Sequence, residues 1–249
     1  MKLIDFIEKG SDQEYLATLL VLNLTVDDDV DQDLLYTFSA VLSYCVNLKE
    51  FILQYGFIGV QQDLKYNILF NILKDAVTLN NLDMSFNCIG NLIDADIASL
   101  SSFIAASNLE RINLNDNNLY QLDNNNFQTL FFAIKHCKNL QHLYLSYNEL
   151  HNVNDYKFDV LCNALLDCEN LVHFEMMLPY IEENRKQEIL RIKQIVIARS
   201  GDEPREYGIL VSSSGLNLDQ EFKFPSLEKT NSPRSPSKYK FILPKCSIL

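Results

Sequence analysis

The residues best placed for covalent chemistry are the last four of the sequence, Cys246, Ser247, Ile248 and Leu249. They form a C-a-a-X pattern, in which the thiol of a cysteine four residues from the end accepts a prenyl group and a final leucine favours geranylgeranyl. Ser247 departs from the pattern, because that position is usually aliphatic. We predict that a eukaryotic prenyltransferase alkylates Cys246 and that the lipid holds the protein on the cytosolic face of a membrane.

A basic segment precedes this cysteine. One lipid chain anchors a protein only weakly, so stable anchoring usually needs a second signal such as a basic cluster. Residues 229–249 contain five basic and no acidic side chains, and each basic group adds about 1 kcal/mol near an anionic leaflet. Since the whole chain carries −12, its first 228 residues carry −17, which argues against nucleic acid as a partner. The polar composition from about residue 200 predicts a flexible, disordered tail.

Other chemical motifs are missing from the sequence. The histidines at 136, 142, 151 and 173 show no zinc-ligand spacing, and the seven glycines form no phosphate-binding loop. The acidic run that starts at Asp27 has Gln32 where a calcium loop needs Gly and Phe38 where it needs Glu. An acidic lead-in to a helix is the better interpretation. We therefore expect no enzyme activity, no metal and no cofactor.

An eleven-residue phrase with aliphatic residues at positions 1, 4, 6 and 11 and Asn at position 9 occurs three times, in residues 79–89, 109–119 and 140–150. Looser copies begin at Leu48 and Leu171, each 31 residues away from the nearest phrase. Alternation within the phrase predicts a short strand, and apolar residues at helical spacing between phrases predict a helix. Neither element can bury its apolar face alone, so the units must stack into a parallel sheet with helices outside.

The asparagine at position 9 is Asn87, Asn117 or Asn148 in the three full copies. It follows the strand where the chain turns, and a buried turn needs donors and acceptors for its backbone groups. We therefore expect these amides to bond the backbones of neighbouring coils. Gly56 and Pro179 stand at this position in the looser copies, which weakens the predicted ladder at both ends.

These patterns predict four parts: an N-terminal cap (1–47), the repeats (48–181), a C-terminal cap helix (182–199) and the basic tail (200–249). Ile189, Ile192 and Val196 form the apolar stripe of the cap helix. Two alternatives remain open for residues 11–26. They are a helix that starts at a capping box, Ser11 to Glu14, or a degenerate repeat whose frame is Leu16, Leu19, Val21 and Val26.

The phrase resembles the leucine-rich repeat, and its period resembles the long, helix-containing variety. The resemblance covers about residues 48–181 and implies an α/β solenoid, a curved horseshoe with a short parallel sheet on the concave face and helices on the convex face. With the C-a-a-X ending, the acidic, Asn-rich body looks like leucine-rich-repeat effectors that intracellular bacterial pathogens deliver into host cells. That resemblance implies delivery to, or synthesis in, a eukaryotic cytosol. A eukaryotic prenylated F-box leucine-rich-repeat protein is the alternative, although the first 47 residues contain no F-box pattern.

Alternation also places the outward side chains of successive strands in columns about 4.8 Å apart. Tyr, Arg and Met side chains there are types that protein interfaces favour. We expect a non-enzymatic protein–protein interaction module, with a soluble adaptor or ubiquitin-ligase substrate receptor as the alternative. The expected partner-binding residues are Asp83, Arg111, Asn113, His142, Tyr144, Tyr147, His173 and Glu175.

Overall fold

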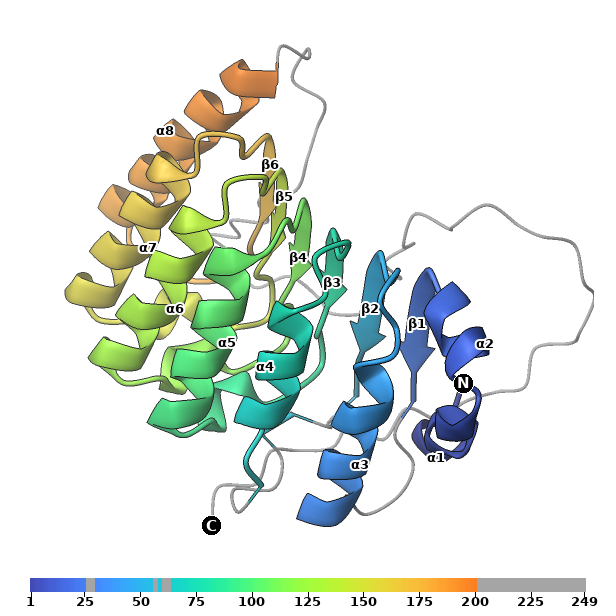
Figure 1. Cartoon of the computed structure of the whole chain (residues 1–249). Coiled ribbons are helices and arrows are strands. Elements are labelled where there is room, and N and C mark those ends of the chain that lie inside the picture. The colour runs from blue at the N-terminus through green and yellow to red at the C-terminus, as the bar shows by residue number, and fades with distance from the viewer. Residues whose placement is uncertain (26–29, 56–57, 60–63, 201–249) are drawn as a thin grey trace, which may run out of the picture.

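The computed structural model describes residues 1–25, 30–55, 58–59 and 64–200, which form a parallel sheet that alternates with helices (Figure 1). Six strands pair in chain order, and every neighbouring pair is parallel. Each strand residue pairs with the residue at the same position of the next repeat. The strands are β1 (Val21–Leu24), β2 (Glu50–Leu53), β3 (Asn81–Asp83), β4 (Arg111–Asn113), β5 (His142–Tyr144) and β6 (His173–Glu175).

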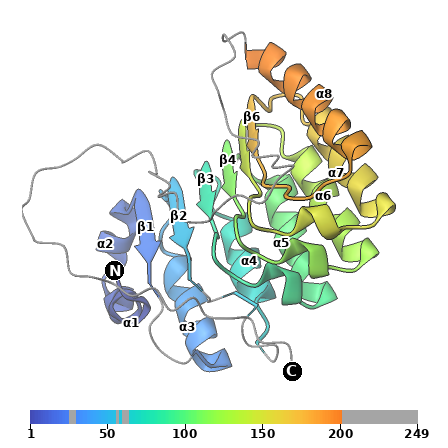
Figure 2. The same ribbon diagram turned by 180° about the vertical axis from the view of Figure 1, so that it is seen from behind.

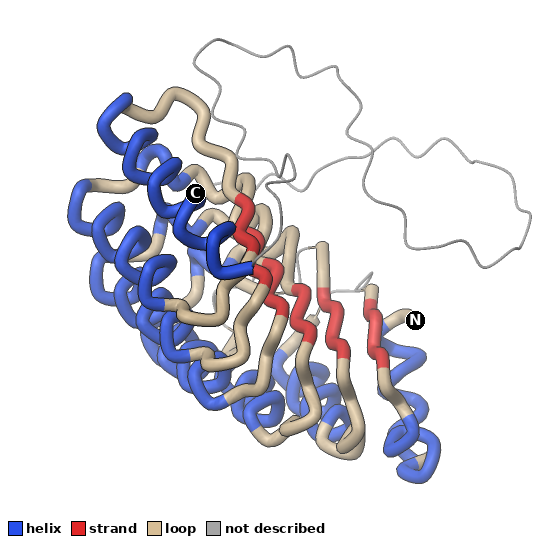
Figure 3. Tube along the Cα trace, turned by 90° about the horizontal axis from the view of Figure 1, so that it is seen from above, coloured by secondary structure: helices blue, strands red, loops and turns tan. Residues whose placement is uncertain are grey.

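From α3 to α8, one α-helix follows each strand, and these helices lie on one side of the sheet, whereas α1 and α2 precede β1 and lie beside it (Figure 2). Viewed from above, the strands line the inner side of an arc and the helices its outer side (Figure 3). The predicted α/β solenoid-like repeat arrangement is therefore present. The α-helices are α1 (Leu3–Glu8), α2 (Gln13–Thr18), α3 (Gln32–Leu42), α4 (Asn67–Lys74), α5 (Asp94–Ala106), α6 (Asn124–His136), α7 (Asp155–Asp167) and α8 (Glu183–Ser200). Short 3-10 turns are η1 (Lys9–Ser11), η2 (Ile89–Asn91), η3 (Leu119–Gln121) and η4 (Leu150–Asn152).

The aliphatic positions of the phrase build the interior between sheet and helices. Leu82, Ile112 and Leu143 occupy position 4 in the three full copies and are fully buried, as are Leu114 and Leu145 at position 6. Because a strand alternates, these side chains enter the core while their neighbours face the inner side of the arc. The predicted inward register of the three full repeats is confirmed.

The asparagine ladder also has the predicted geometry. The Asn148 side chain is fully buried, and its Oδ1 accepts the backbone N–H of Asn117 at 2.9 Å. Its Nδ2 donates to the carbonyl oxygens of Leu114 at 2.7 Å and Leu145 at 3.0 Å. Asn87 and Asn117 make equivalent bonds to the preceding coils. Each amide therefore joins two turns that would otherwise bury unpaired backbone groups.

Acidic residues at the helix starts accept hydrogen bonds from backbone N–H groups. Asp96, in the first turn of α5, is buried. Its Oδ1 accepts the N–H of Asn67 at 2.7 Å, at the start of the preceding helix α4. Burial raises the pKa of this carboxyl, against the smaller effect of its backbone hydrogen bonds. The α6 helix is capped by Asp123 and α3 by Asp31, so the acidic lead-in to α3 is confirmed as a helix start.

The N-terminal segment contains both a helix and a strand. Helix α2 begins after Asp12, whose Oδ1 accepts the N–H of Tyr15 at 3.0 Å, so Asp12 is the cap and the predicted box at Ser11 is wrong. Strand β1 pairs Leu22 with Phe51, and Leu22 is buried. The two alternatives for residues 11–26 are thus successive elements.

The predicted frame of that first strand is wrong. The frame predicts an inward Val21, but this side chain is 52% exposed, whereas Leu22 and Leu24 are buried. The strand pairing gives the frame as Leu19, Leu22 and Leu24. The sequence alone allows either frame, because leucines recur every three residues from Leu16. Val26 lies outside the described residues.

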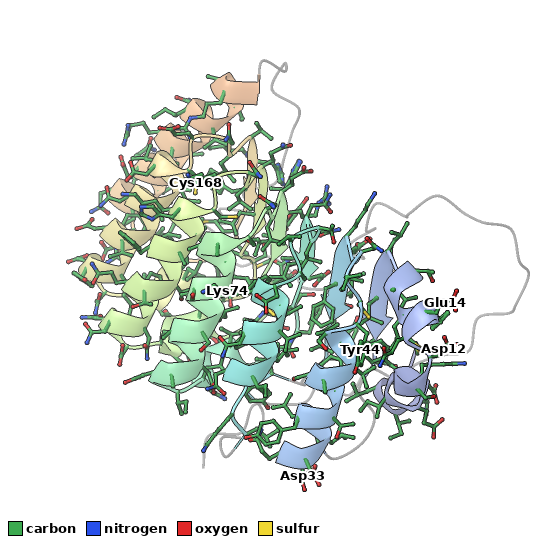
Figure 4. The ribbon with its side chains drawn as sticks, in the orientation of Figure 1. Asp12, Glu14, Asp33, Tyr44, Lys74 and Cys168 are labelled. Carbon is green, nitrogen blue, oxygen red and sulfur yellow. The ribbon has the colours of Figure 1, made fainter. Side chains whose placement is uncertain are left out.

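Both ends of the sheet are covered. At β1, Lys2 forms a parallel bridge with Thr25, and the N-terminal amino group donates to the Asn23 carbonyl at 3.0 Å. At the other end, α8 buries the predicted stripe of Ile189, Ile192 and Val196. Its Arg199 donates to the Cys168 carbonyl at 2.7 Å, near the end of α7. Figure 4 labels Asp12 and Glu14 at the N-terminal end and Cys168 at the opposite end.

Cysteines at the repeated helix-end position are small buried groups. Cys45, Cys137 and Cys168 are free thiols, and each is buried. Burial raises the pKa of Cys45 to about 11 and that of Cys168 to about 12. Because the thiolate is the reactive form, these three groups are inert fillers of the core.

Candidate interaction surface on the inner face of the sheet

The outward side chains of the strands form two continuous columns across β2 to β6, in the register predicted from the sequence. Neighbouring members are register partners in adjacent parallel strands. One column is Glu50, Asn81, Arg111, His142 and His173, and the central column is Ile52, Asp83, Asn113, Tyr144 and Glu175.

A third column of side chains, two residues further along each strand, is only partly exposed. Ser85 and Ser146 are buried, although alternation predicts them to be outward. The Ser146 hydroxyl donates to Glu175 Oε1 at 3.1 Å, and the Ser85 hydroxyl donates to Asp83 Oδ1 at 2.7 Å. These two serines support the central column and are themselves covered.

In the first half of the inner face, polar side chains bond one another. Asp83 Oδ2 accepts Gln54 Nε2 at 2.9 Å and Asn113 Nδ2 at 3.0 Å, and Asp83 Oδ1 accepts the N–H of Ser85 at 2.9 Å. We call these four residues the Asp83 network. In the neighbouring column, Asn81 Nδ2 donates to Glu50 Oε1 at 2.7 Å. Asp83 and Asn113, predicted as partner-binding residues, are therefore engaged with their neighbours.

In the second half, a cation and three rings meet. The Arg111 guanidinium lies 5.7 Å from the centre of the Tyr144 ring. The His173 ring lies 5.5 Å from that of Tyr144 and 5.9 Å from that of His142. We call these four residues the Arg111 cluster. They come from β4, β5 and β6, and all four are among the predicted binding residues.

Burial changes the titration of this cluster. Burial lowers the pKa of His173 to about 4, and the positive charges of His142, Lys193 and Arg111 act in the same direction. The pKa of His142 is lowered too, by burial and then by Arg111, against a smaller opposing effect of Glu110. Burial raises the pKa of the Tyr144 phenol. At neutral pH the cluster therefore presents neutral rings around one arginine charge.

A feature that the sequence did not indicate lies just after the strands. The residue before the turn position adopts a left-handed backbone in four successive coils, with φ between 54° and 69°. Such a conformation is uncommon for bulky side chains. Tyr147, predicted to bind a partner, belongs to this row and is 48% exposed, beside the central column. The row is Tyr55, Phe86, Asp116 and Tyr147, and the rings of its first two members stack at 5.1 Å.

The sequence also predicted a lipid site and a membrane-binding tail, and both lie outside the described residues, as do Cys246 and the basic cluster before it. Within the described part of the chain, no helix combines the length and apolarity that crossing a membrane requires. That same part contains no group of three or more His, Cys, Asp or Glu side chains arranged to hold a metal ion.

No protein-family model matches the chain, and no curated protein matches its sequence. Among solved structures, one similar chain is described as "Leiomodin-1 Actin-Binding Site 2 (ABS2)". It shares 12% sequence identity with a TM-score of 0.44, and the match covers 79% of this chain and 90% of that chain. No partner can be transferred at that level of similarity.

Proposed function

We propose that this chain is a protein-binding module of the leucine-rich-repeat type, and that its partner docks on the Arg111 cluster and the adjoining Tyr147 and Glu175. The observation that carries the proposal is the contrast between the two halves of the inner face. The Asp83 network uses its polar groups internally. The Arg111 cluster presents a half-buried tyrosine, two histidines and an exposed arginine side by side.

The side-chain types support this choice of surface. Tyrosine and arginine are among the residues most enriched where single side chains dominate binding energies. An inner sheet surface of a solenoid also holds its side chains on rigid strands, so little conformational entropy is lost when a partner binds. Exposed aromatic residues on the helices, such as Phe132 on α6 and Tyr36 on α3, are separated by the helices α4 and α5.

The proposal can be tested with a displayed peptide library selected against the folded protein. Selected ligands should lose binding to Tyr144→Ala, Arg111→Glu and His142→Ala. Two matched controls on helices, Tyr36→Ala and Lys74→Glu, should bind as the wild type does. Figure 4 labels Lys74 on α4, on the outer layer. Circular dichroism would show that each variant is folded. Ligands that bind all three inner-face variants unchanged would refute the proposed surface.

We propose in addition that Cys246 carries a prenyl group, which would hold the module on the cytosolic face of a eukaryotic membrane. This part rests on the sequence alone, namely on the C-a-a-X tetrapeptide and the five basic residues of 229–249. Intact mass after expression in eukaryotic cells measures it directly, together with the identity of the terminal residue. Cys246→Ser should move the protein from membranes to the cytosol. A wild-type protein without lipid mass in such cells would refute prenylation and leave the binding module untouched.

A further inference from the structure

One charged group on the inner face has hydrogen-bonding capacity that its neighbours do not use. Of the four arginines in the described residues, Arg185, Arg191 and Arg199 each donate to a carbonyl or carboxylate oxygen. Arg111 differs, because its guanidinium donates to no oxygen of those residues. Its side chain is exposed. A guanidinium carries five N–H donors in one plane. Because the Arg111 side chain is exposed, those donors are accessible to a partner.

The surroundings of Arg111 fix its position and limit the charge of the site. The Tyr144 ring, 5.7 Å away, supports the cation through its π face. His142 is the register partner of Arg111 on the next strand. With their lowered pKa values, His142 and His173 stay neutral at pH 7, so neither ring adds a full charge to the site.

We propose that the Arg111 cluster binds a side-chain carboxylate in an acidic segment of the protein partner, an inference that rests on the proposed function. The planar donor edge of arginine matches the two oxygens of a carboxylate. The cluster crosses β4, β5 and β6, so it spans roughly 10 Å, which about three residues of extended peptide cover.

The same electrostatics disfavour a phosphate group. Glu175 and Glu110 lie near enough to influence the protonation of Tyr144 and His142, respectively. A phosphate monoester carries about −1.5 to −2 charges at neutral pH, which exceeds the single charge of the Arg111 guanidinium. Lys193 acts on His173 at one end of the cluster and is not among the charges that shift the pKa of His142 or Tyr144. A single carboxylate is the better match in charge.

Fluorescence anisotropy with three labelled peptides would test this. The peptides share a Gly-Ser sequence and differ in carrying Glu, Gln or phosphoserine at the same spaced positions. We expect the Glu peptide to bind about tenfold or more tightly than the Gln peptide, since hydrogen bonds to charged groups are of that size. Arg111→Gln should remove the preference, whereas Lys74→Gln should keep it. Equal binding of the Glu and Gln peptides would overturn the inference, as would tighter binding of the phosphoserine peptide.

Arg111→Lys tests the geometry apart from the charge. Lysine keeps the positive charge but loses the planar pair of donors, so this variant should bind the Glu peptide with an affinity between those of wild type and Arg111→Gln. Wild-type affinity in Arg111→Lys would overturn the bidentate site. Failure of the inference is distinguishable from failure of the proposed function: library ligands that still depend on Tyr144 but show no acidic bias would refute the carboxylate and leave the docking surface standing.

Discussion

The two halves of the inner face are built on the same sheet and the same core, but their central charged groups, Asp83 and Arg111, differ in hydrogen bonding. In the Asp83 network, each carboxylate oxygen accepts a bond from a neighbouring side chain. In the Arg111 cluster, rings surround a guanidinium that has no oxygen partner within the described residues. Polar groups that hydrogen-bond one another stabilise the fold, whereas the Arg111 guanidinium can donate its hydrogen bonds to another molecule.

The largest expected effect tests whether the two halves share one interior. Leu82→Ala beneath the first half and Leu143→Ala beneath the second should each lower the free energy of unfolding by about 2 to 5 kcal/mol, because both side chains are fully buried. Urea denaturation followed by circular dichroism measures both. A clear loss in one variant and none in the other would mean that the halves differ in their cores as well as on their surfaces.

The next prediction tests whether the first half of the inner face stabilises the fold and does not bind the ligand. Asp83→Ala should cost about 1 to 3 kcal/mol, because Gln54, Asn113 and Ser85 all lose an acceptor. The same denaturation curves measure it, and the selected peptides should bind this variant as they bind wild type. Strong loss of peptide binding with unchanged stability would reverse the roles assigned to the two halves.

The two halves should also differ in pH dependence, because both inner-face histidines belong to β5 and β6. His173 has a pKa of about 4 in the folded protein, below the ordinary 6.5. As the pH falls from 6.5 toward 4, the unfolded chain takes up this proton first, so the free energy of unfolding decreases. Above pH 6.5 that contribution to stability is fully present. His173→Gln should make the decrease shallower, measured by denaturation at each pH. An unchanged slope would mean that His173 is not the group responsible.

The smallest effect is expected for Arg111 itself. Its guanidinium donates to no oxygen among the described residues, so Arg111→Ala should change the free energy of unfolding by about 0.5 kcal/mol or less. Thermal melts beside wild type measure it. A loss as large as that of Asp83→Ala would show that Arg111 stabilises the fold, and the distinction between the halves would fail.

Strong periodicity made most of the fold predictable. The spacing of Leu79, Leu109 and Leu140 determines the parallel register, because each strand can bury its leucines in one way only. The same alternation predicts that Arg111, His142 and His173 share one column, and they do. Asn148 and its equivalents were predictable because a buried turn leaves backbone groups that a side-chain amide can bond.

The sequence predictions fail where the local pattern of residues carries no information about how the coils pack. Ser85 and Ser146 follow the outward alternation, but each comes directly before a left-handed residue where the chain turns away from the strand. The left-handed positions hold Tyr147 and its equivalents, with no glycine to signal them. Asp96 lies in the first turn of α5, and only the stacking of coils shows that it bonds the neighbouring helix. The contact of Arg111 with Tyr144 is equally a product of stacking.

Photocrosslinking would locate the bound ligand on one half of the inner face or the other. The photoreactive residue p-benzoylphenylalanine would replace Tyr147 beside the second half, Tyr55 at the equivalent left-handed position beside the first half, and Tyr36 on α3. With the tightest peptide from the library, we expect a crosslink from position 147 and none from positions 55 or 36. Crosslinking from position 55 or 36, with none from 147, would contradict the proposed docking surface.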